Sequence, residues 1–271
     1  HEYTVYDKDY VFTDFGRTGA VVTNIYSYLD YDLPSEVSYC SACDEAQFAW
    51  SWSSIHDWIN GAWSSTNSHS LWNYYSGIRD ANFFLEESQN ADFSELKEDK
   101  NYVAEMNRFN RYKYEVRFLR AYFYFDLCRL FGTVPLLTTS EPENVPRATA
   151  EELYAQIAFD LKTAIEKLPS VKYSAANNSE LGRATKWAAE ALLARAYLFY
   201  TGYYQQESMP LLDNSTLSRT DVITYLDDCI NNSGHDLIGD FRNLWPYSNV
   251  YTKKDYKYAQ DNDLHWIGED G

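Results

Sequence analysis

The sequence predicts an all-α protein. Apolar side chains recur at helical spacing along most of the 271 residues, and strand-like alternation extends nowhere beyond a few residues. Two neighbouring helical segments have faces rich in alanine, and Leu153 in the first stands 34 residues before Trp187 in the second. Because this is the period of the tetratricopeptide repeat, we expect stacked tetratricopeptide-like helix pairs with long irregular loops inserted between them.

The first third of the chain is expected to hold two helices joined by a long loop. The first helix is predicted over residues 13–28, with Thr13 or Asp14 as its N-cap. An irregular region rich in Ser, Asp, Trp and Tyr follows over residues 30–70. Helical spacing of apolar side chains then resumes over residues 71–85.

A longer, bent or broken helix is predicted from residue 93 or 95 to residue 131. Gly132 supplies the permissive backbone of a helix end, and Pro135 prevents further helix. Five charged residues lie among the aromatic side chains of this helix, and we expect buried or half-buried ion pairs that lock helix to helix. They are Glu115, Arg117, Arg120, Asp126 and Arg129.

The alanine-rich helix pair comes next. Thr149 and Glu152 have the spacing of a capping box at the start of its first helix, which Pro169 ends. The second helix is predicted over residues 183–200, and the alanines on its face allow two helix axes to approach closely.

The end of the sequence is less regular. After a shorter helix over residues 220–231, an aromatic tail runs to Gly271 without a closing helix. A stacked helical array needs a polar cap at its end. We therefore expect residues 1–271 to form a single α-helical domain that is the N-terminal part of a longer protein.

Composition excludes some classes of partner. A formal net charge of −17 opposes binding to nucleic acid or to an anionic membrane surface. No apolar run reaches the roughly 18 residues of a membrane span, and no signal peptide is visible. Four cysteines are too few for a disulfide framework, and Cys40 with Cys43 fits a local disulfide or free thiols better than a zinc site.

No catalytic motif is present. The sequence contains no G-x-S-x-G, H-E-x-x-H, phosphate-binding loop or G-x-G-x-x-G, and its five histidines are scattered. With 40 acidic residues in the chain, some pair of carboxylates will always exist, so such a pair does not indicate a glycosidase. We therefore expect no catalytic residues, no metal ligands and no cofactor.

Three segments stand in a characteristic order: EVRFLRAYFYFDLCRLFGTVPL over residues 115–136, RATAEELYAQI over 147–157 and GRATKWAAEALLARAYL over 182–198. Together they resemble the SusD/RagB-like family, the nutrient-binding lipoproteins of the Bacteroidetes outer membrane. Weaker agreement over residues 26–29, 44–46 and 72–85 extends the resemblance across most of the helical region. Any one of these segments alone would be only an amphipathic helix, so their order carries the resemblance.

The resemblance implies a non-catalytic binding protein with tetratricopeptide-like helix pairs. It implies a lipid anchor on a cysteine upstream of this chain and a location on the outer face of the outer membrane. Such proteins cover a SusC-like TonB-dependent transporter and pass oligosaccharides, or in some members peptides, to it. The expected partners are therefore an oligosaccharide or polysaccharide and that transporter.

Ligand contact is expected in the irregular region over residues 30–70, because recognition concentrates on loops that a rigid scaffold carries. A sugar offers an apolar face to an aromatic ring and hydroxyls to carboxylates and amides. The candidate glycan-binding residues are Trp63, supported by Asp44 and Asn67, and then Trp52, Asp30 and Asp32. Core packing remains an alternative for Trp52 and Trp63, and Asp30 and Asp32 also suit turns.

Three other functions remain open. The same fold could bind peptides or act as a lid, it could be a helical glycoside hydrolase, or it could be a tetratricopeptide adaptor with only protein partners. The sequence does not identify the sugar.

Overall fold

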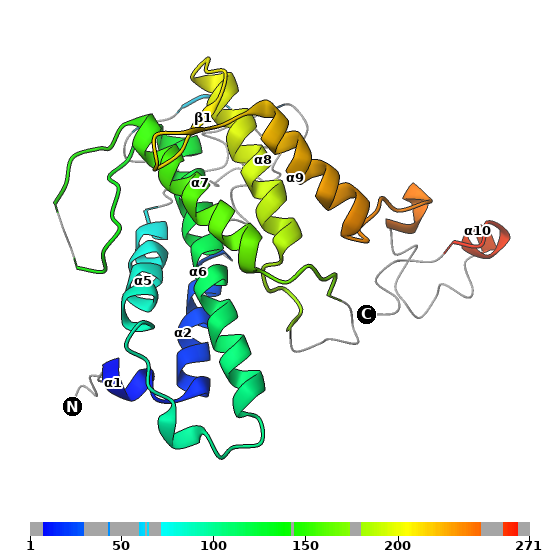
Figure 1. The fold of residues 1–271 in the computed structure, drawn as a ribbon. Helices are drawn as coiled ribbons and strands as arrows, with labels where there is room; N and C mark the ends of the chain where they lie inside the picture. Colours follow the sequence, from blue (N-terminus) through cyan, green and yellow to red (C-terminus); the bar gives the residue numbers. More distant parts are fainter. Residues whose placement is uncertain are drawn as a thin grey trace.

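The computed structural model describes residues 8–29, 43, 60–62, 64, 72–141, 144–173, 180–244 and 257–264. Within these ranges the regular structure is helical apart from two strands of two residues each, which confirms the predicted all-α class (Figure 1). None of the described helices has the length and apolar character that a membrane span requires.

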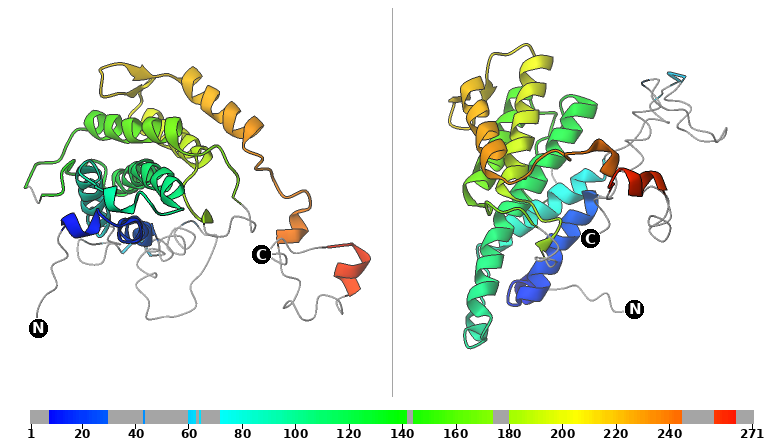
Figure 2. Two further views of the ribbon diagram at one scale, coloured as in Figure 1. Left: turned by 60° about the horizontal axis from the view of Figure 1, so that its bottom comes forward. Right: turned by 90° about the vertical axis from the view of Figure 1, so that its right-hand side faces the viewer.

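The main helices stack in successive layers, as Figure 2 shows. They are α2 (Phe15–Ser27), α5 (Tyr74–Glu87), α6 (Tyr102–Phe131), α7 (Ala150–Lys167), α8 (Lys186–Tyr203) and α9 (Arg219–Asn232). Helix α2 packs on α5 and α6, α6 packs on α7, α7 pairs with α8, and α9 packs on α8. This stacking of antiparallel pairs is the tetratricopeptide-like arrangement that the sequence predicts.

Shorter elements connect or follow these helices. They are α1 (Lys8–Val11), η2 (Ser94–Leu96), β1 (Met209–Pro210), β2 (Thr216–Leu217), η4 (Phe241–Leu244) and α10 (Lys257–Asp261). Strands β1 and β2 pair antiparallel, with Met209 opposite Leu217. Two residues are too few to produce visible alternation, so this hairpin gives no strand signal in the sequence.

The predicted helix ends are largely confirmed. The Asp14 carboxylate accepts the backbone N–H of Arg17 at 2.8 Å and caps α2. Thr149 and Glu152 form the predicted capping box of α7. Gly132 ends α6 with φ of 74°, a conformation that glycine adopts without steric penalty, and its N–H donates to a carbonyl in the last turn at 2.9 Å.

The predicted start of the long helix at residue 93 or 95 was wrong, because a separate turn precedes α6. The Asp92 carboxylate accepts the Ser94 N–H at 2.9 Å, and the Asp99 carboxylate accepts the Asn101 N–H at 2.7 Å. Such local side-chain bonds compete with helical hydrogen bonding. The 3₁₀ turn η2 therefore forms first, and α6 begins only at Tyr102.

Most aromatic side chains of the described residues are either buried in the core or pack against it. The largest fully buried rings are Tyr74, Phe84, Phe123, Tyr124 and Tyr154. Helices α5 and α6 approach so closely that a β-carbon added at Gly77 would lie 2.7 Å from the Phe123 ring. The aromatic excess of the sequence is thus mainly a packing feature of a thick helical core.

Candidate functional site

The six predicted glycan-binding residues lie outside the described part of the chain. They are Trp63, Asp44, Asn67, Trp52, Asp30 and Asp32. Cys40 of the cysteine pair also lies outside it. Their arrangement stays a prediction, and the described residues supply the frame around them.

One buried ion-pair network joins three helices. Asp160 on α7 is fully buried and accepts hydrogen bonds from Arg120 Nε and Nη2, each at 2.8 Å, and from Arg117 Nη1 at 2.9 Å. Arg120 Nη1 also donates to Asn82 on α5 at 2.7 Å. The Asn82 amide in turn donates to the carbonyls of Leu137 and Thr139 at 3.0 and 2.8 Å. This network fixes α5, α6, α7 and the segment after α6 to one another.

The predicted ion pairs that lock helix to helix are confirmed for Arg117 and Arg120. Arg129 forms a half-buried ion pair with Asp126 at 2.9 Å, and this pair lies within α6. Asp160, the central acceptor, was missed by the sequence reasoning. A signal was available, since this carboxylate interrupts an otherwise apolar helix stripe and a charge in such a position needs a partner.

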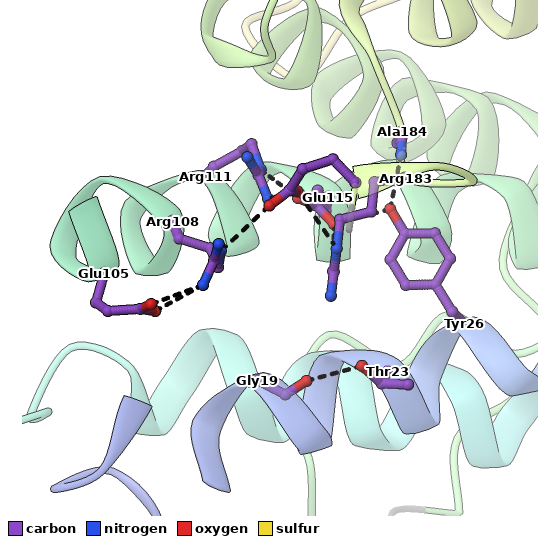
Figure 3. Close-up of polar contacts among 10 residues, drawn as sticks. Gly19, Thr23, Tyr26, Glu105, Arg108, Arg111, Glu115, Arg183 and Ala184 are labelled. Carbon is purple, nitrogen blue, oxygen red and sulfur yellow. Dashed lines mark hydrogen bonds and ion pairs between the residues drawn. The ribbon is translucent and has the colours of Figure 1, made fainter. Parts of the chain in front are cut away.

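A second network surrounds Glu115 on the other half of α6 (Figure 3). This fully buried carboxylate accepts hydrogen bonds from Arg111 Nε at 2.6 Å, Arg183 Nη1 at 3.0 Å and the Tyr26 hydroxyl at 2.9 Å. The Ala184 N–H donates to the same hydroxyl at 2.8 Å. Helix α2, helix α6 and the N-terminal approach to α8 therefore meet at one buried acid, and the prediction that Glu115 joins helices is confirmed.

Glu180 extends this network toward solvent. Its carboxylate accepts hydrogen bonds from Arg108 Nε at 3.3 Å and from Arg111 Nη2. Arg108 Nη1 also donates to both carboxylate oxygens of Glu105, at 2.7 and 2.9 Å. Burial opposes the charged form of Arg183, but the Glu115 carboxylate outweighs it and raises the pKa of that guanidinium. All three arginines are thus paired with carboxylates.

A groove of about 700 Å³ with a mixed polar and apolar lining opens between α2 and the start of α6, beside this network. We call it the α2–α6 groove. Its α2 side is formed by Asp14, Phe15, Gly16, Gly19, Ala20 and Thr23. Its other side is formed by Leu96, Asp99, Asn101, Tyr102, Glu105, Arg108, Tyr112 and Arg183. This volume lies within the usual range of small-molecule sites.

The described residues do not form a metal centre, since no cluster of three or more His, Cys, Asp or Glu side chains among them could hold an ion. What the groove offers instead is hydrogen bonding. Carboxylates, hydroxyls and an amide converge there beside aromatic rings. Such a set can bind a polar ligand without breaking its bonds.

A smaller pocket of about 470 Å³ lies between α8 and α9. Glu190 is fully buried at its wall, and Lys186 Nζ lies 3.6 Å from its Oε1. Burial raises the pKa of Glu190 to about 7, although Lys186 opposes the shift. Lys186 also forms an ion pair with Asp228 on α9, so these three residues join the two helices.

Comparisons with known proteins agree with this architecture. A family model of SusD-like proteins, described as "Starch-binding associating with outer membrane", matches residues 17–198. A SusD-like protein of Bacteroides ovatus is 32% identical over 139 residues, which make up 50% of this chain and 23% of that protein. SusD-like protein P2 of Formosa agariphila is 34% identical over 97 residues, which make up 34% of this chain and 18% of that protein.

Solved structures show the same fold. A SusD-like protein from Bacteroides fragilis superposes with a TM-score of 0.62 at 26% identity, covering 89% of this chain and 43% of that one. A laminarin-binding SusD-like protein superposes with a TM-score of 0.65 at 23% identity, covering 87% of this chain and 49% of that one. The chain therefore spans less than half of each of these relatives. With a family match over more than half of its own length, the chain belongs to the SusD-like family, whose members associate with the outer membrane.

Proposed function

We propose that the chain is the glycan-capturing part of a non-catalytic protein on the outer face of the bacterial outer membrane. It holds oligosaccharides weakly and passes them to a SusC-like TonB-dependent transporter. Support comes from the family match over residues 17–198, which is the observation that carries the proposal. Further support comes from two solved relatives, one named as laminarin-binding and one solved with a xylogluco-oligosaccharide.

The residues on either side of the segment 30–70 suit this role, because both sides are fixed to the core. Beyond the end of α2, the Tyr28 hydroxyl donates to Asp80 on α5 at 3.1 Å, and Asn24 on α2 donates to the same carboxylate at 3.1 Å. At the start of α5, the Tyr75 hydroxyl donates to the Pro135 carbonyl at 2.6 Å. Recognition loops gain affinity when rigid elements hold their ends.

The residues proposed to grip the glycan are Trp63 by stacking and Asp44 and Asn67 by hydrogen bonds, with Trp52, Asp30 and Asp32 in support. One aromatic contact is worth about 0.5–1.5 kcal/mol, and each net hydrogen bond about 1 kcal/mol. Together they give millimolar to micromolar affinity, which suits a protein that must release its ligand.

Replacing Trp63 with alanine tests the proposal. Isothermal titration against oligosaccharides from laminarin, xyloglucan and starch should show about tenfold weaker binding in Trp63→Ala, the upper end of one stacking contact. The melting temperature should change little. Tyr203→Ala is the matched control, because this aromatic side chain is 69% exposed on α8, and it should leave the affinity unchanged.

Other outcomes would favour other functions. Binding of peptides with no response to any glycan would contradict glycan capture and support a peptide-binding member of the family. Shortening of a glycan during prolonged incubation would show a hydrolase. For the transporter, co-purification of the full-length protein with a TonB-dependent outer-membrane protein is expected, and its absence under mild extraction would contradict the hand-over.

A further inference from the structure

We propose that the α2–α6 groove is a second saccharide-binding site, selective for neutral, hydroxyl-rich oligosaccharides. The inference deepens the proposed function and rests on it for the class of ligand. It uses described residues only and does not involve the region over residues 30–70.

The α2 side of the groove leaves room for a ligand. Gly16, Ala20 and Thr23 are exposed one helical turn apart, and Gly19 lies between them. A β-carbon at Gly19 would lie 3.1 Å from the Tyr112 hydroxyl, so this glycine lets the hydroxyl lie close against α2 at the groove. Four small side chains in succession make this face of α2 a flat wall.

Tyr112 is the feature that points to a ligand. Its side chain is only 6% exposed, yet its hydroxyl lies at the groove and forms no hydrogen bond with any described residue. Burial raises the pKa of Tyr112, so the hydroxyl stays protonated and can both donate and accept. A sugar hydroxyl entering the groove would supply the hydrogen-bond partner that the described residues do not offer this hydroxyl.

The charges of the groove favour a neutral ligand over an anion. Its two arginines, Arg108 and Arg183, already pair with Glu105 and Glu115 at 2.7 and 3.0 Å. The lining also carries Asp14 and Asp99, so negative groups predominate. Carboxylates repel an anionic ligand but accept hydrogen bonds from vicinal hydroxyls, which is the chemistry that a neutral sugar presents.

Aromatic rings complete the site at the end of the groove. Phe15 and Tyr102 meet edge to face with ring centroids 5.9 Å apart, and Phe15 stacks on Phe93 at 4.2 Å. This packing holds the two rings in place. They offer an apolar surface for the C–H face of a sugar next to the polar wall.

Filling the groove provides the test. Surface plasmon resonance with the immobilised chain, titrated with oligosaccharides from laminarin, xyloglucan and starch, should show two classes of site. Thr23→Trp should remove one class and about halve the saturating response. Thr224→Trp is the matched control, because both threonines are exposed and both donate to the carbonyl four residues earlier, at 3.1 Å and 3.0 Å.

A second variant separates binding from folding. Tyr112→Phe removes only the hydroxyl, keeps the packing and should weaken the groove site about fivefold, the value of one net hydrogen bond. If Thr23→Trp and Tyr112→Phe both bind as the parent does, the groove is not a saccharide site, although a loss in Trp63→Ala would still support the proposed function. If instead Trp63→Ala binds normally while Thr23→Trp does not, the groove site stands and the predicted loop contacts fail.

Two further outcomes would overturn the groove site. In the first, the chain binds a cationic peptide but no oligosaccharide, and Thr23→Trp blocks the peptide binding. This result would assign the groove to another class of ligand. The other is the absence of any oligosaccharide response from the parent chain, which would overturn the proposed function as well.

Discussion

The buried ion pair between Asp160 and Arg120 makes the strongest stability prediction. Asp160→Asn keeps the shape of the side chain and removes its charge. The Asp160 side chain is fully buried and that of Arg120 is 6% exposed, so solvent cannot replace the lost partner. Arg120 would retain the Asn82 oxygen at 2.7 Å and one amide oxygen at position 160 as acceptors, but neutral amides do not balance a buried guanidinium.

Breaking a buried pair by removing one partner costs about 3–5 kcal/mol. We therefore expect Asp160→Asn to lose about that much free energy of unfolding, measured by urea denaturation followed by circular dichroism. Asp261→Asn is the matched control. Its partner Lys257 lies at 2.6 Å, but the two side chains are 54% and 83% exposed, so the loss should stay below about 1 kcal/mol.

A double variant separates charge burial from packing. Arg120→Met with Asp160→Leu removes both buried charges and should be more stable than Asp160→Asn alone, because the charge that loses its partner, Arg117, is 24% exposed to solvent. The reasoning fails if Asp160→Asn lies within about 1 kcal/mol of the parent, since the site would then behave as an exposed pair. It also fails if the double variant is the less stable of the two.

Two further predictions concern α8 and the contact between α5 and α6. The pKa of Glu190 rises from 4.5 to about 7 on folding, so its burial destabilises the chain progressively as pH rises through that window. Glu190→Gln should therefore gain about 2 kcal/mol over the parent between pH 4.5 and 8 in urea titrations, and a pH-independent difference would contradict the buried acid. Gly77→Ala should lose about 1–3 kcal/mol because its β-carbon would meet Phe123 at 2.7 Å. Gly202→Ala, with nothing within 4 Å, should gain about 0.4–1 kcal/mol, and equal thermal shifts in the two variants would refute the close contact.

Local features of the fold could be predicted because their causes are local. The capping box at Thr149 and the helix end at Gly132 depend on side chains and dihedral angles within a few residues. The stacked helix pair followed from apolar periodicity and from one spacing of 34 residues between Leu153 and Trp187. The start of α6 was mispredicted because the Asp92 and Asp99 turns act locally as well, but against the helix.

The two candidate sites differ in how far the sequence alone could predict them. The segment over residues 30–70 was chosen from its composition, and its contacts stay predictions. The α2–α6 groove carried no sequence signal, because its small residues on α2 resemble any exposed helix face until α6 is placed opposite. Only their juxtaposition with the Tyr112 hydroxyl supports a role in binding.

The sequence by itself determined the helical class, most helix ends and the family resemblance, since each depends on neighbouring residues. It also indicated that charged residues on α6 would need buried partners. Only the tertiary structure decided which partners these are. Asp160 lies 40 residues from Arg120, and Arg183 lies 68 residues from Glu115. No local pattern selects between acids at such separations, because the choice depends on which helix faces pack together and thereby exclude water from one particular pair.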